Sequence, residues 1–343
     1  MSFTQNLASF IDYRDYFYIF DNGSAQQLEH QPVKSYKTGK KCAAYINNLG
    51  RFKVYFNGEL IELEKHNVIE YFTTDNLVVY KVDNELNVFD NGIVKSLVYF
   101  PELYGFGDSV VAFYDKVSKY LNVYYNGRII PIGEGLVDFP AKSMRVGDNL
   151  VAFKDKTDYL KIFYHGKIFE SIYFPQVFKT GRNVVAYIDG TSSEFGIFYN
   201  GDVFETEPFK PISFEVGNEM VVYVDYSGSF KVFHEGEVFS ISSFEPDFYL
   251  VRDDIVLFGD GNFFKVFFNG EVFTLENYIP IKYYIDNDLV AYIDQFGFLR
   301  CFYQGENHKL SDEKVSNVVV AGNTISYKQG LNTNKVFSNG KIY

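Results

Sequence analysis

Short apolar runs alternate with polar turns along the whole chain. Residues 265–275 read KVFFNGEVFTL, with one apolar run on each side of Asn269 and Gly270, and residues 53–63 (KVYFNGELIEL) and 122–132 (NVYYNGRIIPI) repeat this layout. Asn-Gly between two apolar runs predicts a two-residue β-hairpin, because a type I′ turn needs positive φ at both central residues. The pattern therefore predicts strands joined by tight turns.

The hairpin glycine recurs ten times at a nearly constant spacing. Successive copies are 34 or 35 residues apart, except for one gap of 39 residues. Ten copies at one period predict a tandem-repeat architecture. The ten glycines are Gly23, Gly58, Gly92, Gly127, Gly166, Gly201, Gly236, Gly270, Gly305 and Gly340.

Two aromatic columns run through the repeat, one three residues before the hairpin glycine and one in the strand upstream of it. Cys301 stands in the β-branched column beside the first, and Cys42 in an apolar column three residues before the second. Both cysteines are therefore predicted to be buried as small hydrophobes, and two cysteines so far apart do not indicate a disulfide framework. The columns are Phe20, Tyr55, Phe89, Tyr124, Phe163, Phe198, Phe233, Phe267, Phe302 and Phe337, and Phe10, Tyr45, Tyr80, Phe113, Phe153, Tyr187, Tyr223, Phe258, Tyr292 and Tyr327.

Proline sets the phase of the repeat, because it cannot donate to a strand ladder and marks the break between sheets. Each repeat then reads strand A, a tight polar turn, strand B, a variable loop, strand C, the Asn-Gly turn and strand D. Strand A of the first repeat falls on residues 2–5 (SFTQ). Residues 1–343 are predicted to form a single repeat domain, with repeats starting near residues 1, 32, 67, 101, 140, 175, 211, 246, 280 and 315.

Strands B and C carry apolar residues on both faces, which predicts sheets that are covered on both sides. Four short antiparallel strands per repeat, covered by similar neighbours, predict an all-β, ten-bladed β-propeller with four-stranded blades of about 35 residues. An open superhelical array of the same repeats is the alternative. The layout resembles tryptophan-glycine-type repeats in repeat length, glycine-centred hairpin, apolar pair and following proline and aromatic, although this chain contains no Trp.

Charge and composition argue against several classes of partner. The formal net charge is −12 and the arginines are scattered singly, whereas nucleic acids and anionic membranes attract a positive footprint. No apolar run approaches the roughly 18 residues of a membrane helix, and the N-terminus lacks the basic region of a signal peptide. We expect no nucleic-acid partner, no membrane insertion and a cytoplasmic location.

The sequence contains no recognisable catalytic or metal-binding signature. The five histidines lack ligand spacing, and neither the 259–262 turn (GDGN) nor the 285–288 turn (IDND) has the length or terminal Glu of an EF-hand loop. No nucleophile elbow or phosphate-binding loop is present. We therefore expect no cofactor, no metal and no enzymatic activity.

The variable parts of the repeat indicate where function lies. Strand direction alternates, so the B–C loops and D–A connections share one face, and this face carries all the length variation, including the insertion at residues 133–139. Loops on a rigid scaffold are typical binding sites. We expect a non-catalytic scaffold or assembly component that binds a protein partner there, in a larger complex. A carbohydrate-binding propeller and a channel-site hydrolase or lyase are the alternatives. The candidate partner-binding residues are Glu134, Asp138, Phe139, Tyr226 and Phe296.

Overall fold

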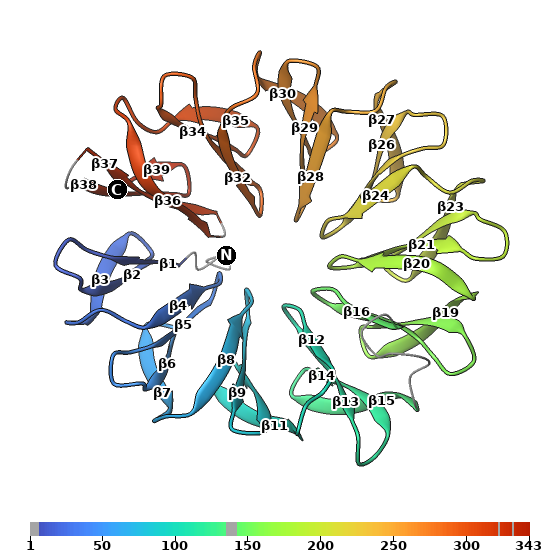
Figure 1. The fold of residues 1–343 in the computed structure, drawn as a ribbon, viewed down its shortest axis with the longest axis horizontal. Coiled ribbons are helices and arrows are strands. Elements are labelled where there is room, and N and C mark those ends of the chain that lie inside the picture. Colours follow the sequence, from blue (N-terminus) through green and yellow to red (C-terminus); the bar gives the residue numbers. More distant parts are fainter. Residues whose placement is uncertain (1–6, 135–142, 322, 331–332) are drawn as a thin grey trace. The chain divides into compact units, whose positions relative to one another are not determined.

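The computed structural model describes residues 7–134, 143–321, 323–330 and 333–343. The described residues form 39 β-strands and no helical element. Within each sheet, strands that follow one another in the chain pair antiparallel. This pairing gives ten sheets, numbered here in chain order (Figure 1). Nine sheets have four strands, and sheet 1 has three within the described residues. The predicted strand A of the first repeat, residues 2–5, lies outside the described residues.

Sheets 1 to 5 occupy the first half of the chain. Sheet 1 contains β1 (Ala8–Ile11), β2 (Phe17–Asp21) and β3 (Ser24–Glu29). Sheet 2 contains β4 (Ser35–Thr38), β5 (Cys42–Ile46), β6 (Phe52–Phe56) and β7 (Glu59–Glu64). Sheet 3 contains β8 (Val68–Thr73), β9 (Leu77–Val82), β10 (Glu85–Asp90) and β11 (Ile93–Tyr99). Sheet 4 contains β12 (Tyr104–Phe106), β13 (Val110–Asp115), β14 (Tyr120–Tyr125) and β15 (Arg128–Glu134), and sheet 5 contains β16 (Met144–Val146), β17 (Leu150–Lys154), β18 (Tyr159–Tyr164) and β19 (Lys167–Tyr173).

Sheets 6 to 10 repeat the same order. Sheet 6 contains β20 (Pro175–Thr180), β21 (Val184–Asp189), β22 (Phe195–Tyr199) and β23 (Asp202–Glu207). Sheet 7 contains β24 (Ser213–Val216), β25 (Met220–Val224), β26 (Phe230–His234) and β27 (Glu237–Ser242), and sheet 8 contains β28 (Phe248–Arg252), β29 (Ile255–Asp260), β30 (Phe263–Phe268) and β31 (Glu271–Glu276). Sheet 9 contains β32 (Lys282–Asp286), β33 (Leu289–Ile293), β34 (Leu299–Tyr303) and β35 (Glu306–Lys309). Sheet 10 contains β36 (Val315–Ala321), β37 (Thr324–Gln329), β38 (Thr333–Ser338) and β39 (Lys341–Ile342).

The hairpin between strands C and D has the predicted turn in every repeat. The φ angles of Asn269 and Gly270 are 47° and 81°, which is the pair of positive values that a type I′ turn requires. His165, Glu235 and Gln304, which replace Asn, adopt φ of 47°, 51° and 51°. All ten hairpin glycines have positive φ, so this prediction is confirmed.

Strands B and C are the central strands of each four-stranded sheet, and they hold the core. The aromatic column before the hairpin glycine is buried in all ten repeats, and the upstream column is buried in nine, with Phe10 half-buried. Cys42 and Cys301 are fully buried among apolar side chains, which confirms that they act as small hydrophobes.

Neighbouring sheets pack through a recurring set of three rings. In sheet 2, the ring of Phe52 lies 5.0 Å from Tyr71 and 5.2 Å from Tyr80 of sheet 3, measured between ring centroids. Phe195 of sheet 6 makes the same contacts with Phe214 and Tyr223 of sheet 7, both at 5.2 Å. Tilted aromatic contacts of this kind add to the burial of large apolar surfaces.

The strands are grouped in two compact units. Unit 1 comprises Met1–Ser96 and Pro280–Tyr343, and unit 2 comprises Leu97–Ile279. Within unit 2, the A strands of successive sheets lie next to each other, as β12, β16, β20, β24 and β28. In unit 1, the A strands β4 and β8 lie next to each other, as do β32 and β36, and β1, which is strand B of sheet 1, lies next to β4.

The last sheet packs against the first within unit 1. Strands β1 and β37 are in contact, and Ala8, Phe20 and Val336 form a small buried cluster. The rings of Phe20 and Tyr343 lie 5.2 Å apart, and the hydroxyl of Thr324 donates to the Leu7 carbonyl at 3.5 Å. An open superhelical array would keep the first and last sheets apart, so this contact contradicts the alternative architecture.

Candidate functional site

The candidate residues from the sequence lie on three different sheets. Tyr226 and Phe296 occupy the B–C loops of sheets 7 and 9, and their side chains are 61% and 63% exposed. Glu134 ends β15 in sheet 4 and pairs with Lys156 at 3.0 Å. Asp138 and Phe139 lie outside the described residues. The three described candidates therefore lie on separate sheets, and whether any of the five binds a partner stays a prediction.

Five of the B–C loops are held by a carboxylate or amide at their first residue. Asp225 Oδ1 accepts hydrogen bonds from the backbone N–H groups of Ser227 at 2.8 Å and Ser229 at 3.0 Å. Such side-chain bonds to nearby backbone groups stabilise tight turns. They make these loops a rigid support for whatever residues lie at their tips. Asp12, Asn47, Asp155 and Asp294 make the same pair of bonds in their own loops.

Large apolar side chains are exposed along the loop face of unit 2. Those around sheets 5 to 7 come from the last residue of β19, from the D–A connections after sheets 5, 6 and 7 and from the B–C loop of sheet 7. Large apolar side chains that gather on a protein surface often mark an interaction site. We name the following six residues the apolar loop row: Tyr173, Phe174, Phe209, Ile212, Tyr226 and Phe244.

Neighbouring loops meet within the apolar loop row. The rings of Phe209 and Tyr226 pack edge to face, with centroids 5.0 Å apart. The backbone N–H of Phe174 donates to the Asp158 carbonyl at 2.7 Å, and the Phe174 carbonyl accepts from the N–H of Gly190 at 3.1 Å. The D–A connection at Phe174 is thus joined to the B–C loops of sheets 5 and 6. These bonds fix the backbone while the side chains stay exposed.

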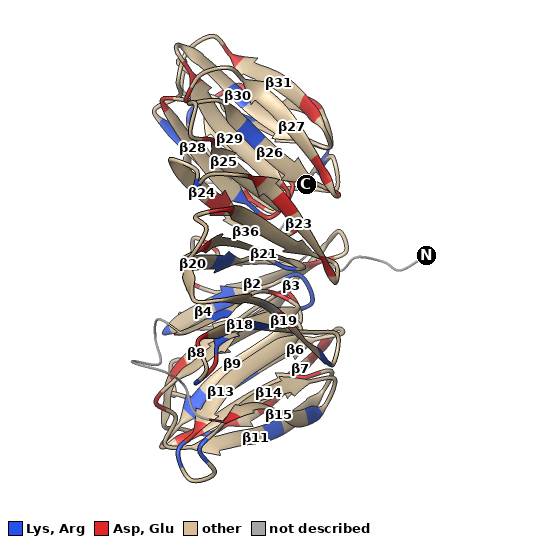
Figure 2. Cartoon of the chain, turned by 90° about the vertical axis from the view of Figure 1, so that its right-hand side faces the viewer, with Lys and Arg blue, Asp and Glu red and all other residues tan. Residues whose placement is uncertain are grey.

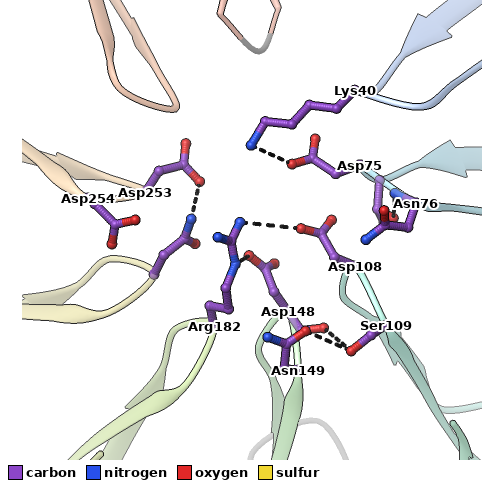
Figure 3. Close-up of polar contacts among 12 residues, drawn as sticks. Lys40, Asp75, Asn76, Asp108, Ser109, Asp148, Asn149, Arg182, Asp253 and Asp254 are labelled. Carbon is purple, nitrogen blue, oxygen red and sulfur yellow. Dashed lines mark hydrogen bonds and ion pairs between the residues drawn. The ribbon is translucent and has the colours of Figure 1, made fainter. Parts of the chain in front are cut away.

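The A–B turns are polar, in contrast to the loop face. In unit 2, a chain of hydrogen bonds passes from turn to turn across five sheets, and Figure 3 shows its first link, between Ser109 and Asn149. Ser109 Oγ donates to Asn149 Oδ1 at 2.7 Å, and Asn149 Nδ2 donates to Asn183 Oδ1 at 2.9 Å. Asn183 Nδ2 then donates to Glu219 Oε1 at 2.7 Å, and the backbone N–H of Glu219 donates to Asp254 Oδ1 at 2.9 Å. Each residue in this series bonds to a neighbouring sheet, which indicates a structural role.

Charged residues in the same turns are also paired. In unit 2, the Arg182 guanidinium lies 3.5 Å from an Asp108 carboxylate oxygen and 3.3 Å from one of Asp148 (Figure 3). Burial alone lowers the pKa of Arg182, but the carboxylates of Asp148 and Asp108 outweigh this effect and raise it. In unit 1, Lys40 Nζ pairs with Asp75 at 2.9 Å. One guanidinium is thus shared by two carboxylates of neighbouring turns, and Lys40 pairs with a third.

A second column of glycines lies in the A–B turns and lets neighbouring turns approach closely. The sequence analysis did not identify this column. A Cβ atom on Gly147 would lie 1.7 Å from the Gly181 carbonyl oxygen, and one on Gly181 would lie 1.7 Å from that of Gly217. Gly39 and Gly107 meet the backbone of the next turn in the same way. The sequence signal was a glycine followed by two polar residues before strand B, as in GDS, GDN, GRN and GNE.

No group of three His, Cys, Asp or Glu side chains within the described residues is placed to hold a metal ion. Burial raises the pKa of the Cys301 thiol, which keeps it protonated and unreactive. Acidic side chains occur along outer strands such as β23, β27 and β31 (Figure 2). Within the described residues, no helix is long and apolar enough to span a membrane.

Comparison with known proteins identifies the family. The model of the 10-bladed beta propeller domain matches residues 1–343, so the chain belongs to this family. The fold expected from the sequence, an all-β ten-bladed propeller, is thereby confirmed. No protein with a curated description matches the chain.

Several solved structures resemble the chain at low identity. The computationally designed Ika8 protein is 17% identical, with 80% of this chain and 94% of that chain covered and a TM-score of 0.33. Prp20p from Saccharomyces cerevisiae is 9% identical, with 61% and 74% covered and a TM-score of 0.34. Hsv2p from Kluyveromyces lactis is 9% identical, with 79% and 92% covered and a TM-score of 0.34. We draw nothing about function from likenesses this distant.

Proposed function

We propose that this member of the ten-bladed propeller family is a non-catalytic scaffold that binds a protein partner through the apolar loop row of unit 2. The main support for this proposal is that six large apolar side chains are exposed, one on the last residue of β19 and five on loops. Backbone hydrogen bonds, such as those of Phe174 and Ile212, hold these segments in place. Buried aromatic anchors supply most of the affinity in protein interfaces. A preformed anchor surface binds with little loss of conformational freedom.

The contrast between the loop face and the A–B turns supports this assignment. The turns of unit 2 carry amides, carboxylates and Arg182, and these groups are bonded to one another. The apolar loop row has aromatic rings at 49% to 77% exposure. A protein surface gains most by covering apolar area that water would otherwise solvate. The loop face therefore offers the larger gain on binding.

A carbohydrate-binding propeller is the second candidate, because Tyr226 and Phe209 form an exposed aromatic pair on which a sugar ring could stack. The pair has no charged or amide side chain bonded to it in the described contacts, whereas sugar sites combine ring stacking with polar groups. The channel-site hydrolase is less well supported, because strand A residues such as Lys37 and Glu215 bond to neighbouring strands.

The proposal is tested by identifying the partner and then removing the anchors. Native mass spectrometry of the protein from its own source should reveal a complex, and crosslinks should map to the apolar loop row. The double variant Phe209→Ser, Tyr226→Ser should release the partner while the melting temperature changes by less than about 3 °C, as expected for exposed sites.

The matched control is Val203→Ser, an exposed apolar residue on outer strand β23. This variant should keep the partner bound. Retention of the partner by the loop double variant, or its loss from the Val203 variant alone, would refute the assignment to the loop face. A protein that is monomeric in its own source would refute the scaffold function itself.

A further inference from the structure

A cavity of about 460 Å³ lies between the C–D turns of sheets 7 and 8. A volume of this size suits one small ligand or one side chain of a peptide. Both sheets belong to unit 2, and the chain that forms them is described throughout. We name this space the turn cavity, and it is lined by His234, Glu235, Glu237, Phe239, Asn269 and Gly270.

The turn cavity lies where a column of aromatic side chains changes. Two residues before the hairpin glycine, six repeats carry Tyr or Phe, whereas sheet 7 carries His234. The His234 ring packs edge to face against Phe267 of sheet 8, with centroids 6.2 Å apart. Tyr199 packs in the same way against Phe233 at 5.6 Å, so His234 points to the next sheet as a tyrosine does. The column consists of Asp21, Phe56, Asp90, Tyr125, Tyr164, Tyr199, His234, Phe268, Tyr303 and Ser338.

Two tyrosines of this column bond to the first residue of the next C–D turn. The Tyr125 hydroxyl lies 3.2 Å from His165 Nδ1. The Tyr164 hydroxyl donates to Asn200 Oδ1 at 2.9 Å. An imidazole is shorter than a phenol, and within the described residues neither ring nitrogen of His234 has a hydrogen-bond partner, although this residue is only 8% exposed. Buried polar groups nearly always have a partner, so the imidazole is available to a group that enters the turn cavity.

The turn cavity is acidic. Glu237 and Phe239 are two residues apart in β27, so their side chains share one face of the strand, and Phe239 packs against Phe267 of sheet 8. Within the described part of the chain, the Glu237 carboxylate has no cation partner, and none of the six lining residues is Lys or Arg. Glu235, whose charge also acts on Tyr199 of sheet 6, adds a second carboxylate. An unpaired acidic lining favours a cationic ligand.

The lining also indicates which cation fits. The Glu237 carboxylate, the Asn269 amide oxygen and a nitrogen of neutral His234 are all hydrogen-bond acceptors. No three metal-ligating side chains of the described residues are placed around one point, so a metal ion would lack ligands here. A guanidinium is planar and weakly hydrated, carries its N–H donors in a fixed fork, and packs against aromatic rings such as that of Phe239. An ammonium is a more strongly hydrated point charge with fewer donors.

We propose that the turn cavity binds a guanidinium group, as found in arginine. The guanidinium pairs with Glu237, donates to His234 and Asn269, and packs against the Phe239 ring. Free arginine and an arginine side chain of a peptide present the same group, so both are sources of it. The turn cavity shares no residue with the apolar loop row. The proposal is therefore independent of the proposed protein-binding function.

Ligand-detected NMR titration of the full chain tests the proposal. We expect saturable binding of N-acetyl-L-arginine amide, and binding at least about tenfold weaker for N-acetyl-L-citrulline amide, which has a similar shape without the charge. Absence of saturable binding by the arginine probe would overturn the proposal, as would equal affinity for the citrulline probe. Equal affinity for N-acetyl-L-lysine amide would overturn the assignment to a guanidinium. Free L-arginine separates the sources: tighter binding than the blocked probe supports the free amino acid, and equal or weaker binding supports an arginine within a peptide.

Three variants locate the site. Glu237→Gln should weaken binding of the arginine probe at least about tenfold, whereas the control Asp202→Asn, an exposed carboxylate at the same repeat position of sheet 6, should leave it unchanged. His234→Tyr restores the residue of the three preceding sheets and fills the turn cavity, so it should abolish binding while the melting temperature of the ligand-free protein stays equal or rises. Undiminished binding by Glu237→Gln or by His234→Tyr would place the ligand elsewhere and overturn the proposal. Because Glu237 is exposed, its variant decides the matter even where His234→Tyr does not fold.

Discussion

The Tyr223 hydroxyl of sheet 7 donates a hydrogen bond to Glu207 Oε1 of sheet 6 at 3.0 Å. Lys231 Nζ pairs with the same carboxylate oxygen at 2.8 Å. Burial, followed by the charge of Glu207, raises the pKa of Tyr223, so the phenol stays protonated and remains the donor. The bond ties the outer part of one sheet to the core of the next.

The same pair of a tyrosine hydroxyl and a glutamate carboxylate recurs between other neighbouring sheets. Tyr45 bonds to Glu29 at 3.0 Å, and Tyr80 bonds to Glu64 at 3.3 Å. Where the aromatic column carries Phe113, Phe153 or Phe258, the position opposite is Val98, Gly133 or Ser242. At Gly133 a Cβ atom would lie 2.9 Å from the Phe153 ring, so the ring occupies that space. Glu stands at this position for four of the six tyrosines of the column, whereas Tyr187 and Tyr327 have Ile172 and Ser311 there.

Tyr223→Phe should lower the free energy of unfolding by about 1 kcal/mol, because it removes one bond to a charged acceptor and leaves Lys231 in place. Urea denaturation of this variant and of Tyr226→Phe, which alters an exposed tyrosine, measures the difference. A loss of equal size in both variants would show that the Glu207 bond contributes nothing.

Phe267→Ala should lower the free energy of unfolding by about 3–5 kcal/mol. The Phe267 side chain is fully buried and packs against Phe239 at 5.7 Å between centroids. The control Val272→Ala removes an exposed apolar side chain on β31 and should change stability by less than about 0.5 kcal/mol. A change under about 1 kcal/mol for Phe267→Ala would contradict its assignment to the core.

Gly270→Val should destabilise the sheet 8 hairpin by at least about 1 kcal/mol, because a β-branched residue is strained at the φ of 81° found there. Asn269→Gly tests the preceding position, where φ is 47°, and should be tolerated because glycine adopts this conformation readily. Thermal unfolding compares the two variants. Equal melting temperatures for wild type and Gly270→Val would be incompatible with the turn.

Gly147→Ala should prevent normal packing of the A–B turns of sheets 5 and 6, since its Cβ would lie 1.7 Å from the Gly181 carbonyl oxygen. We expect loss of cooperative unfolding or a drop in melting temperature of more than about 10 °C, because backbone must shift. Asp148→Ala, at the next residue, leaves the backbone approach unchanged and should be much milder. A Gly147→Ala protein as stable as wild type would show that the turns separate without loss.

Acid titration should reveal the contribution of Asp155. Burial would raise the pKa of Asp155, but hydrogen bonds from Lys161 and Thr157 and from the backbone of Tyr159 outweigh it and lower the pKa to about 2. Because the folded pKa is depressed, the stability contributed by Asp155 is complete above the unfolded pKa of about 4 and is lost as the pH falls toward 2. The stability difference between wild type and Asp155→Asn should therefore shrink over this interval. A difference that is constant from pH 5 to 2 would contradict the shifted pKa.

The local sequence pattern was sufficient to predict the repeat, its hairpins and its core columns. Asn-Gly turns, β-branched columns and paired aromatics act through neighbouring residues and through identical contacts in every repeat, so ten copies of a weak signal reinforce one another. The burial of Cys42 and Cys301 followed from the columns in which they stand. The exposed loop residue Tyr226 was also named from the sequence, because its loop varies between repeats.

Only the tertiary structure decided which columns meet and what lies between them. The hydrogen-bond chain from Ser109 to Asp254 joins residues about 35 positions apart, and no local propensity encodes these contacts. Val336 is an ordinary apolar residue in the sequence, and its packing depends on the contact between the last and the first sheets, between residues more than 300 positions apart. Long-range packing determines whether a side chain is solvated or buried, because the space around it belongs to both sheets that bound it.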